Sequence, residues 1–553
     1  MGGSGSLTIS TCLVSLLLTV WISSLDSLTL EPPRPPTQPP IFDGEPFIVS
    51  WNIPNLTCNR YNITLNTSPY RGVSNPAKVP GQFLSLFYID RLGLYPYVDQ
   101  GTKHQFHGGV PQRGNLRESL AKAHGDIHHY IPSRSSQGLA VIDWEEWRPL
   151  WERNWGSKQI YQSLSVTYAR RRNPALPLRR AMAQAKQRFQ SAAKSYMLET
   201  LSLGTRLRPN YQWGFYLFPN CYNYGWDEWR YTGECPREVR RQNNQLMWLW
   251  EASTALYPSI YLQALLGDSH RAALMARHRL HEALRVAALP RRRRHTVPIY
   301  AYARLVFVDR TKTLLSLRDL IHTIGESAAM GASGAVLWGS SGDYDDKASC
   351  EALSAYLDDT INPYVVNVTV AAKLCADFLC KGKGRCVRRN FNSDTYLHLS
   401  ADSFTIKRSE VTAEFTVDGQ PSLQDLMEFA KGFTCQCYAG MNCDTKIPRP
   451  TSRPTHKRTT STTTITTSTT TMTTTTTAAT TFATTTDTIT SIPSTSVSHV
   501  TSLTPSPTSD DPLSEVYTVE STQWTTDTLS PQSQTEDLSS FSTTASDIYD
   551  IYV

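Results

Sequence analysis

Basic residues are missing from the end of the chain. From Thr459 to the C-terminus there is no Lys or Arg, whereas ten Asp or Glu are present. The whole chain has 54 Lys and Arg and 48 Asp and Glu, so residues 1–458 carry a formal charge of +16 and the tail carries −10. A folded part this basic attracts polyanions such as nucleic acid, anionic membrane or acidic polysaccharide, and charge alone does not choose among them.

The tail also lacks the apolar residues that a core needs. Thr and Ser dominate residues 448–553. Such a segment cannot offset the entropy of ordering the chain, so we predict a disordered, O-glycosylated, mucin-like tail. It ends in SDIYDIYV, with no apolar segment. We therefore expect neither a transmembrane helix nor a glycosylphosphatidylinositol signal.

Two further absences bear on cofactors. No G-x-G-x-x-G turn follows the first predicted strand, FIVSW at 47–51, which disfavours a doubly wound nucleotide-binding fold without excluding it. No His lies at ligand spacing within the cysteine cluster, so a zinc site is the less favoured interpretation of that cluster. We expect no cofactor and no metal.

The N-terminus has one short apolar run, CLVSLLLTVWI at 12–22. It is shorter than the roughly 20 residues that span a bilayer, and it fits the core of a signal peptide, although positive residues before it are missing. We predict a signal peptide over residues 1–25 and an extracellular, secreted protein, in preference to N-myristoylation of MGGSGS. Four glycosylation sequons agree with export: Asn55, Asn62, Asn66 and Asn367.

The cysteine count agrees with an oxidising compartment. Of eleven cysteines, Cys12 lies in the predicted signal peptide, which leaves an even number. Six of them crowd between Cys375 and Cys443 and end in CQCYAGMNC, a pattern typical of an EGF-like module, here over residues 371–447. Residues 387–434 form a long insertion between the third and fourth of these cysteines, and its segment TYLHLSADSFTI predicts a hairpin.

Between about residues 45 and 365, short apolar runs alternate with helical patterns. The alternation predicts an α/β fold with a parallel sheet, and about seven units favour a TIM-like barrel over residues 26–370. The clearest helical patterns cover 181–208 and 271–289. The predicted strands are 47–51, 83–89, 138–145, 212–218, 259–263, 297–307 and 334–340.

Polar and aromatic residues gather where these strands end, and the chemistry of such barrels lies at the carboxyl ends of the strands. Aromatic rings stack on sugar faces, and carboxylates handle the glycosidic oxygen, so the set predicts a carbohydrate site. Its members are Asp143, Glu145, Arg148, Tyr216, Tyr222, Tyr261, Trp338, Ser340 and Ser341.

The acids Asp143 and Glu145 are the catalytic candidates. Residues two apart in a strand share a face, with their α-carbons about 6.6 Å apart, whereas Glu146 shares the other face with Trp144. Two acids side by side cannot lie on opposite sides of a sugar, as the catalytic carboxylates of ordinary glycosidases do. This favours a mechanism in which one carboxyl acts as acid and then base, while a group of the substrate, such as an acetamido group, acts as the nucleophile. Because neighbouring carboxylates do not both ionise easily, one pKa is expected to rise, and a raised pKa suits the general acid. We assign Glu145 as proton donor and then base, and Asp143 as the acid that positions the acetamido group. The alternative is a solvated strand end with ordinary surface acids.

Five motifs in order resemble the animal hyaluronidases, glycoside hydrolase family 56. They are GLAVIDWEEWRPLWERNW, WGFYLFPNCYNY, ALYPSIYL, VLWGSSGD and HGGVPQ, and the resemblance runs from about residue 45 to 445. It implies a distorted barrel of about seven strands and endo-hydrolysis of β-1,4 bonds after N-acetylhexosamine in hyaluronan, with retention. The chain looks most like the vertebrate membrane-anchored members, but it lacks their apolar tail, so secretion is expected, with cell-surface attachment and lysosomal delivery left open.

The resemblance also implies residue roles. Glu145 matches the proton donor and Asp143 the acetamido-positioning acid, and Tyr261 favours hyaluronan over chondroitin. The expected substrate contacts are Tyr216, Tyr222, Tyr261, Trp338, Arg148, Arg279, Ser340 and Ser341. The tyrosines could instead fill the barrel, Trp338 could cap the core, and Arg279 could be a surface charge. The implied disulfides are Cys58–Cys350, Cys221–Cys235, Cys375–Cys386, Cys380–Cys435 and Cys437–Cys443.

Two other functions stay open at this stage: a hyaluronan-binding or adhesion protein with little turnover, and a chondroitin-preferring hydrolase. The expected partner is hyaluronan, or chondroitin in the second case, with no nucleic acid, no membrane span and a monomeric chain. The basic run PRRRRH at 290–295 precedes the sixth strand, so we predict a solvated loop on the face of the barrel away from the site, rather than a polyanion site or a protease site.

Overall fold

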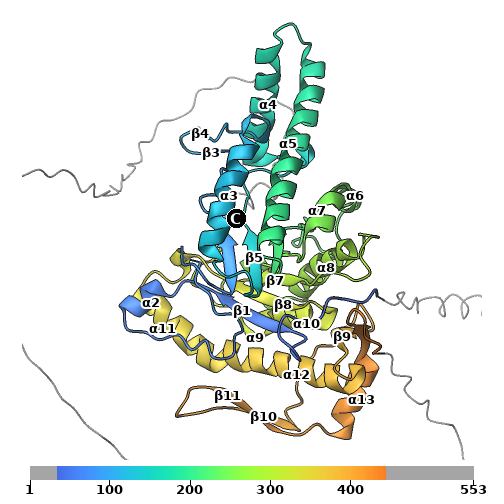
Figure 1. Cartoon of the computed structure of the whole chain (residues 1–553). Helices are drawn as coiled ribbons and strands as arrows, with labels where there is room; N and C mark the ends of the chain where they lie inside the picture. Colours follow the sequence, from blue (N-terminus) through green and yellow to red (C-terminus); the bar gives the residue numbers. More distant parts are fainter. Residues whose placement is uncertain (1–33, 77, 444–553) are drawn as a thin grey trace, which may run out of the picture. The chain divides into compact units, whose positions relative to one another are not determined.

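The computed structural model describes residues 34–76 and 78–443. The predicted signal peptide and Thr-rich tail lie outside the described residues. The main strands form two three-stranded parallel sheets, in the orders β2-β5-β6 and β1-β8-β7 (Figure 1). Their bounds are β1 Ile48–Asn52, β2 Leu84–Phe87, β5 Gly138–Ile142, β6 Tyr211–Phe215, β7 Tyr300–Ala303 and β8 Gly334–Trp338. Each overlaps a strand that the sequence predicts.

Residues 256–260 join the two sheets without forming a regular strand. Isolated parallel bridges connect this segment to both neighbours: Tyr216–Tyr257, Leu256–Ile299 and Ser259–Tyr302. The prediction of a strand over 259–263 is therefore wrong in position and regularity. Pro258 lies in the segment and has no N–H to give to a ladder, which breaks the regular pairing.

An irregular segment, residues 71–74, fills the gap between β1 and β2. The backbone N–H groups of Arg71 and Ser74 donate to carbonyls of β1 at 2.9 Å each. On the other side, the Ser74 hydroxyl accepts the N–H of Leu84 at 3.0 Å, where β2 begins. Because this crossing uses loop backbone and a side chain, the barrel is distorted.

Alternate strand residues face the inside and the outside of the barrel. In β5, Leu139 and Val141 pack with the inner core, whereas Ala140 and Ile142 pack with the outer core beneath the helices. A strand places successive side chains on opposite faces, so this parity governs the residues that follow β5.

Helices cover the outside of the strands, and those predicted over 181–208 and 271–289 are confirmed as α5 (Leu178–Leu207) and α8 (His270–Ala287). Helix α5 buries a stripe that includes Phe189 and Tyr196. Together with α4 (Gln159–Arg172) it forms a hairpin that projects beyond the strands (Figure 1). The other helices around the barrel are α2 Leu56–Arg60, α3 Leu116–Tyr130, α6 Arg237–Gln245, α7 Met247–Ala252, α9 Leu317–Leu320, α10 Glu326–Met330 and α11 Lys347–Tyr356.

Helix α12 (Asn362–Cys380) runs from the barrel into the cysteine-rich segment, so the boundary expected at residue 370 falls inside a continuous helix. The helical stretch Lys347–Cys380 is long and apolar enough to cross a membrane, but 56% of its most apolar window is buried, as in a core helix. In the segment itself, β9 (Gly384–Arg388) pairs antiparallel with β12 (Phe433–Cys437). Five disulfides are formed, in the pairs that the resemblance implies: Cys58–Cys350, Cys221–Cys235, Cys375–Cys386, Cys380–Cys435 and Cys437–Cys443.

The insertion between the third and fourth cysteines of this segment contains a hairpin, but not where the sequence places it. Strands β10 (Phe404–Arg408) and β11 (Phe415–Gly419) pair antiparallel, and α13 (Leu423–Gly432) follows. The predicted hairpin over 395–406 is wrong, because the start of that stretch is not a strand and instead lies along α12. There the N–H of Leu399 donates to the Asn367 side chain at 3.0 Å.

A second small hairpin consists of β3 Tyr97–Val98 and β4 Gln105–Phe106.

Candidate active site

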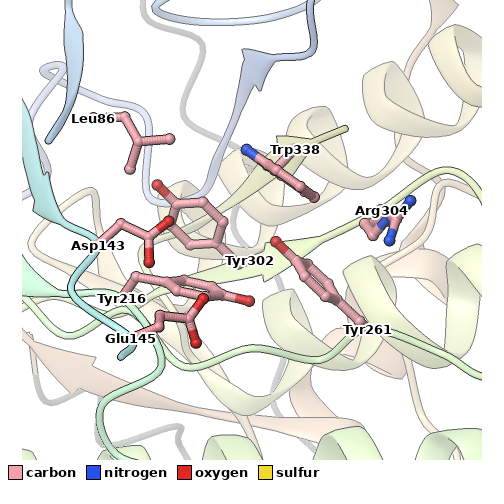
Figure 2. A pocket seen from close by; sticks show the side chains of 8 residues that line it. All are labelled: Leu86, Asp143, Glu145, Tyr216, Tyr261, Tyr302, Arg304 and Trp338. Atoms are coloured by element: carbon pink, nitrogen blue, oxygen red, sulfur yellow. The ribbon is translucent and has the colours of Figure 1, made fainter. Parts of the chain in front are cut away.

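A pocket opens at the carboxyl ends of the strands (Figure 2). It holds about 360 Å³ of space, part of it open to solvent. Two acids, three tyrosines, one tryptophan and one arginine form most of its wall, which is the mixture of rings and carboxyls expected of a sugar site. The lining residues are Leu86, Asp143, Glu145, Tyr216, Tyr261, Tyr302, Arg304 and Trp338.

The backbone after β5 places Asp143 and Glu145 on the same wall of this pocket. The N–H of Asp143 still donates to the Phe87 carbonyl at 2.9 Å, so the strand parity continues past Ile142. Trp144 points the other way, and its ring stacks on Tyr95 with centroids 4.7 Å apart. The parity predicted from the sequence is therefore observed, although the strand itself ends three residues earlier than predicted.

Asp143 is the acid whose pKa is raised. Burial is the largest cause, followed by the charge of Glu145 and a hydrogen bond between the two side chains. Its Oδ1 atom is buried and has no hydrogen-bond partner among the described residues. The raised pKa therefore belongs to Asp143, the acid assigned to positioning, whereas the sequence predicted it for the proton donor. The reason is that burial adds to the effect of proximity at Asp143.

The Glu145 side chain is 20% exposed. The guanidinium of Arg148, which is buried, donates to Glu145 Oε2 at 3.3 Å and also to the Glu145 backbone carbonyl. This holds the carboxyl at the pocket wall while leaving one of its faces open. Arg148 itself is not among the lining residues and acts on the pocket through Glu145.

Glu146, the acid set aside by parity, does not line the pocket. Its side chain is directed to the outer layer, where it is close to Lys158 and Tyr161. Burial raises its pKa, and the positive charge of Lys158 opposes that rise.

Three predicted aromatic residues do line the pocket. The Tyr216 and Tyr261 ring centroids are 6.2 Å apart, and Tyr261 stacks on Trp338 at 6.1 Å with an interplanar angle of 17°. The Trp338 indole N–H donates to the Tyr88 hydroxyl at 3.0 Å, which fixes the ring at the rim. The alternative that these rings only fill the barrel is not supported, because each contributes surface to the pocket.

Sequence reasoning missed Tyr302 and Arg304. The Tyr302 ring is 4.9 Å from Tyr216, and Arg304 lies over both Trp338 and Tyr261, at 5.5 and 5.9 Å. Alternation within the predicted strand 297–307 was a signal for Tyr302. The same alternation places Arg304 on the face of Tyr302, whereas its ion pair with Asp343, which joins residues 39 positions apart, has no local signal.

Besides Arg148, four predicted contacts lie outside the pocket lining. Tyr222 sits under the guanidinium of Arg153, 5.2 Å from its charged carbon to the ring centroid. Arg279 is buried rather than a surface charge, and it donates to the Ser259 carbonyl at 3.0 Å. Ser340 and Ser341 stand at the start of a short 3-10 helix, η6 (Ser341–Asp343), where Asp343 accepts the Ser340 N–H at 2.9 Å. Their roles as substrate contacts stay predictions.

The four sequons differ in accessibility. Asn62 is exposed, and the side chain of Asn55 accepts a hydrogen bond from Asn75 at 2.9 Å. The Nδ2 atom of Asn66, which a glycan would occupy, donates to the Ala413 carbonyl at 2.8 Å. Asn367 accepts the N–H of Leu399 through its oxygen. The described residues contain no cluster of His, Cys, Asp or Glu that could hold a metal.

The sequence model of the hyaluronidase family matches residues 36–447. The chain belongs to the hyaluronidase family. The resemblance seen in the sequence is thereby confirmed, and membership makes the chain a glycoside hydrolase.

Curated relatives cover most of the chain. Hyaluronidase PH-20 of Cavia porcellus is 44% identical over 434 residues, which is 78% of this chain and 81% of that protein. Hyaluronidase PH-20 of Homo sapiens is 42% identical over 410 residues, 74% of this chain and 80% of that protein. Among solved structures, bee venom hyaluronidase in complex with a hyaluronic acid tetramer is similar, with a TM-score of 0.52 and 33% identity. That similarity covers 58% of this chain and 98% of the venom chain.

Proposed function

We propose that the chain hydrolyses hyaluronan at the β-1,4 bonds that follow N-acetylhexosamine, acting within the polymer and retaining the anomeric configuration. The observation that carries the proposal is the placement of Asp143 and Glu145 on one wall of an aromatic pocket, joined by a hydrogen bond. Acids placed in this way cannot stand on opposite sides of a sugar, so the nucleophile has to come from the substrate. The venom enzyme solved with a hyaluronic acid tetramer supports the choice of polymer.

In the first step Glu145 gives its proton to the glycosidic oxygen. The acetamido oxygen of the same N-acetyl sugar attacks C1, and the bond from C1 to the leaving sugar breaks as a positively charged five-membered ring closes. In the second step water attacks C1 from the opposite side, Glu145 takes the proton of that water, and the ring opens to restore the acetamido group. Two inversions at C1 give net retention.

Asp143 positions the acetamido group and stabilises the charged ring. Its buried Oδ1 has no partner among the described residues, so it offers an acceptor to the acetamido N–H without first breaking a bond. As the ring closes, charge develops beside this carboxyl in a site that excludes most water, where a fixed opposite charge is effective.

The raised pKa of Asp143 means that this carboxyl keeps a proton, and the hydrogen bond between the two side chains is the path by which that proton moves to Glu145. When the acetamido N–H occupies Asp143 and the glycosidic oxygen approaches Glu145, the proton is held where the acid is needed. Glu145 is the acid that reaches the substrate, since its side chain is partly exposed at the pocket wall, whereas Asp143 has a buried oxygen.

Reducing-end release from purified hyaluronan and chondroitin tests the proposal, with wild type, Glu145→Gln and Glu146→Gln compared. We expect release from hyaluronan to fall by about 10² to 10⁴ in Glu145→Gln, since general acid-base groups contribute that much. The Glu146→Gln control keeps its activity, because Glu146 faces the outer layer. If wild type binds hyaluronan without releasing reducing ends, the protein is an adhesion protein and not a hydrolase. If it releases reducing ends faster from chondroitin than from hyaluronan, chondroitin is the preferred substrate.

We infer that the enzyme works outside the cell. The described residues hold five disulfides, which persist in oxidising compartments and are rare in the cytosol. Asn62, an exposed sequon residue, is available to an export-linked glycosylation pathway.

A further inference from the structure

The hairpin of α4 and α5 carries a concentration of positive charge that the pocket does not use. Between Glu152 and Glu199 the sequence has ten Lys or Arg and no Asp or Glu. Five of these are arginines at the tip of the hairpin, in the last turn of α4 and the first turn of α5: Arg170, Arg171, Arg172, Arg179 and Arg180. We call these five residues the arginine tip.

All five residues of the arginine tip are exposed. In the described part of the chain none of them has an ion pair with a carboxylate, and Arg172 lies over the Tyr168 ring at 6.0 Å. Lower on the hairpin, by contrast, Lys186 pairs with Glu152.

Helix stability does not explain the tip. The three arginines that end α4 are favoured there by the helix dipole. Arg179 and Arg180 are in the first turn of α5, where the dipole disfavours positive charge, and that turn has no acidic residue. Two exposed charges at an unfavourable position, without a carboxylate partner among the described residues, point to a ligand outside the chain.

The tip stands beyond the pocket end of the barrel. Helix α5 has 30 residues and rises about 45 Å, whereas the five-residue strand β6 that follows it rises about 17 Å. Since α5 runs back toward the start of β6, its N-terminal turns extend past the carboxyl ends of the strands, where the pocket opens. Figure 1 shows this end of the hairpin projecting from the rest of the described fold.

We propose that the arginine tip is a second binding site, separate from the pocket, for an anionic segment of a glycosaminoglycan chain. All five cations are arginines, and a planar guanidinium can donate two parallel hydrogen bonds to one carboxylate or sulfate group. The tip has no acidic residue that would repel an anionic polysaccharide. Among the described residues near the tip, only Leu178 and Met182 expose large apolar surface, which is a much smaller face than membrane-surface helices insert. A long polymer therefore contacts the protein at the tip as well as in the pocket, and short oligosaccharides contact the pocket alone.

The chain offers a matched control at the opposite end of the barrel. The basic run 290–295 forms an irregular loop before β7, as predicted from the sequence, and so lies at the end of the strands away from the pocket. Arg291, Arg292 and Arg294 are exposed, like the tip arginines. Replacing three arginines in either place changes the net charge equally, so only location differs.

The test measures binding in the Glu145→Gln background, where turnover does not interfere. The tip variant carries Arg171→Gln, Arg179→Gln and Arg180→Gln, and the control carries Arg291→Gln, Arg292→Gln and Arg294→Gln. Gln is a good helix former, so the hairpin keeps its fold, which circular dichroism checks. Probes are long hyaluronan, a hyaluronan oligosaccharide that fills only the pocket, heparin, and vesicles containing phosphatidylserine.

We expect the tip variant to bind long hyaluronan about tenfold more weakly at low salt, with a reduced dependence of affinity on salt, and to bind the oligosaccharide normally. The control stays within about twofold for every probe. A loss confined to heparin supports the site and makes its ligand the sulfated members of this class. Three results would overturn the proposal: an equal loss of affinity in the tip and control variants, no loss of affinity for either polymer, or a loss of affinity confined to the vesicles. The identity of the polymer rests on the proposed function, but binding in this background stands or falls without hydrolysis.

Discussion

Two aspartates near the same pocket have opposite surroundings. Asp343 is fully buried, and the Arg304 guanidinium contacts both of its oxygens at 2.6 and 2.7 Å, while the Ser340 N–H donates to it as well. Asp143 lines the pocket with a buried oxygen that has no partner in the described residues, beside a second acid. A carboxyl whose hydrogen bonds are satisfied holds the fold, whereas one left unsatisfied keeps its capacity for a substrate.

The largest effect on stability is expected from Asp343→Asn. Asn keeps the shape but removes the charge, so the buried Arg304 loses its counterion. Breaking a buried pair in this way costs about 3 to 5 kcal/mol. Denaturant unfolding would show a lower midpoint with an unchanged slope. A midpoint equal to wild type would mean that solvent reaches Arg304 and that the contrast between the two aspartates is false.

Asp143→Asn is expected to do the reverse. Turnover of hyaluronan falls by about 10² to 10³, since the charge that stabilises the closing ring is lost. Stability does not fall, because the replaced group has an unpaired buried oxygen and a raised pKa. Initial rates and denaturant unfolding on the same preparation check both parts, and a loss of stability without a loss of rate would contradict the assignment.

The pH dependence of stability sharpens the same contrast. The folded chain keeps a proton on Asp143 at pH values where the unfolded chain, with an ordinary Asp pKa near 3.9, has lost it. Over that window the unfolded state binds fewer protons, so the unfolding free energy falls as pH rises. Relative to Asp143→Asn, wild type should lose stability as pH rises above about 4, by at most about 1.4 kcal/mol per pH unit. If the difference in unfolding free energy between wild type and Asp143→Asn does not change with pH, Asp143 is not the group with the raised pKa.

The smallest effects on activity are expected from substitutions of two tyrosines, Tyr216 and Tyr222. Tyr216 lines the pocket and its hydroxyl is hydrogen bonded to Ser259 and Tyr261, so Tyr216→Phe should lower kcat/KM by about tenfold. Tyr222 lies under Arg153 instead, and Tyr222→Phe should stay within about twofold. Equal losses in both would mean that the bound polymer reaches Tyr222 and that the substrate site extends beyond the pocket.

The strands that position the acids were predictable, because alternation and apolar runs are local properties of the sequence. Strand parity alone placed Asp143 and Glu145 together and turned Glu146 away. The segment 256–260 was not predictable as a broken strand, since its apolar residues suit a strand while Pro258 removes a donor from the ladder. The gap filled by residues 71–74 depends on backbone contacts between distant strands, which no window of sequence contains.

The site residues also divide into those that a local pattern of the sequence predicts and those that depend on contacts between distant residues. Tyr216, Tyr261 and Trp338 lie in the predicted strands and were found. Arg304 shares a face of the predicted strand 297–307 with Tyr302 but was missed, because alternation does not reveal its ion pair with the distant Asp343. Tyr222 was expected in the cleft because it follows a strand, but the loop turns at this residue, whose φ is +46°, and carries the ring to Arg153.

The anomeric form of the first product distinguishes attack by the acetamido group from direct attack by water. Proton NMR of hyaluronan during the first minutes of hydrolysis distinguishes new reducing ends in the β form from those in the α form. If the acetamido group attacks C1 while Glu145 and Asp143 act from one wall, the β anomer appears first and the α anomer only as the sugar equilibrates. An initial excess of the α anomer would mean direct attack by water and would contradict the roles assigned to Asp143 and Glu145.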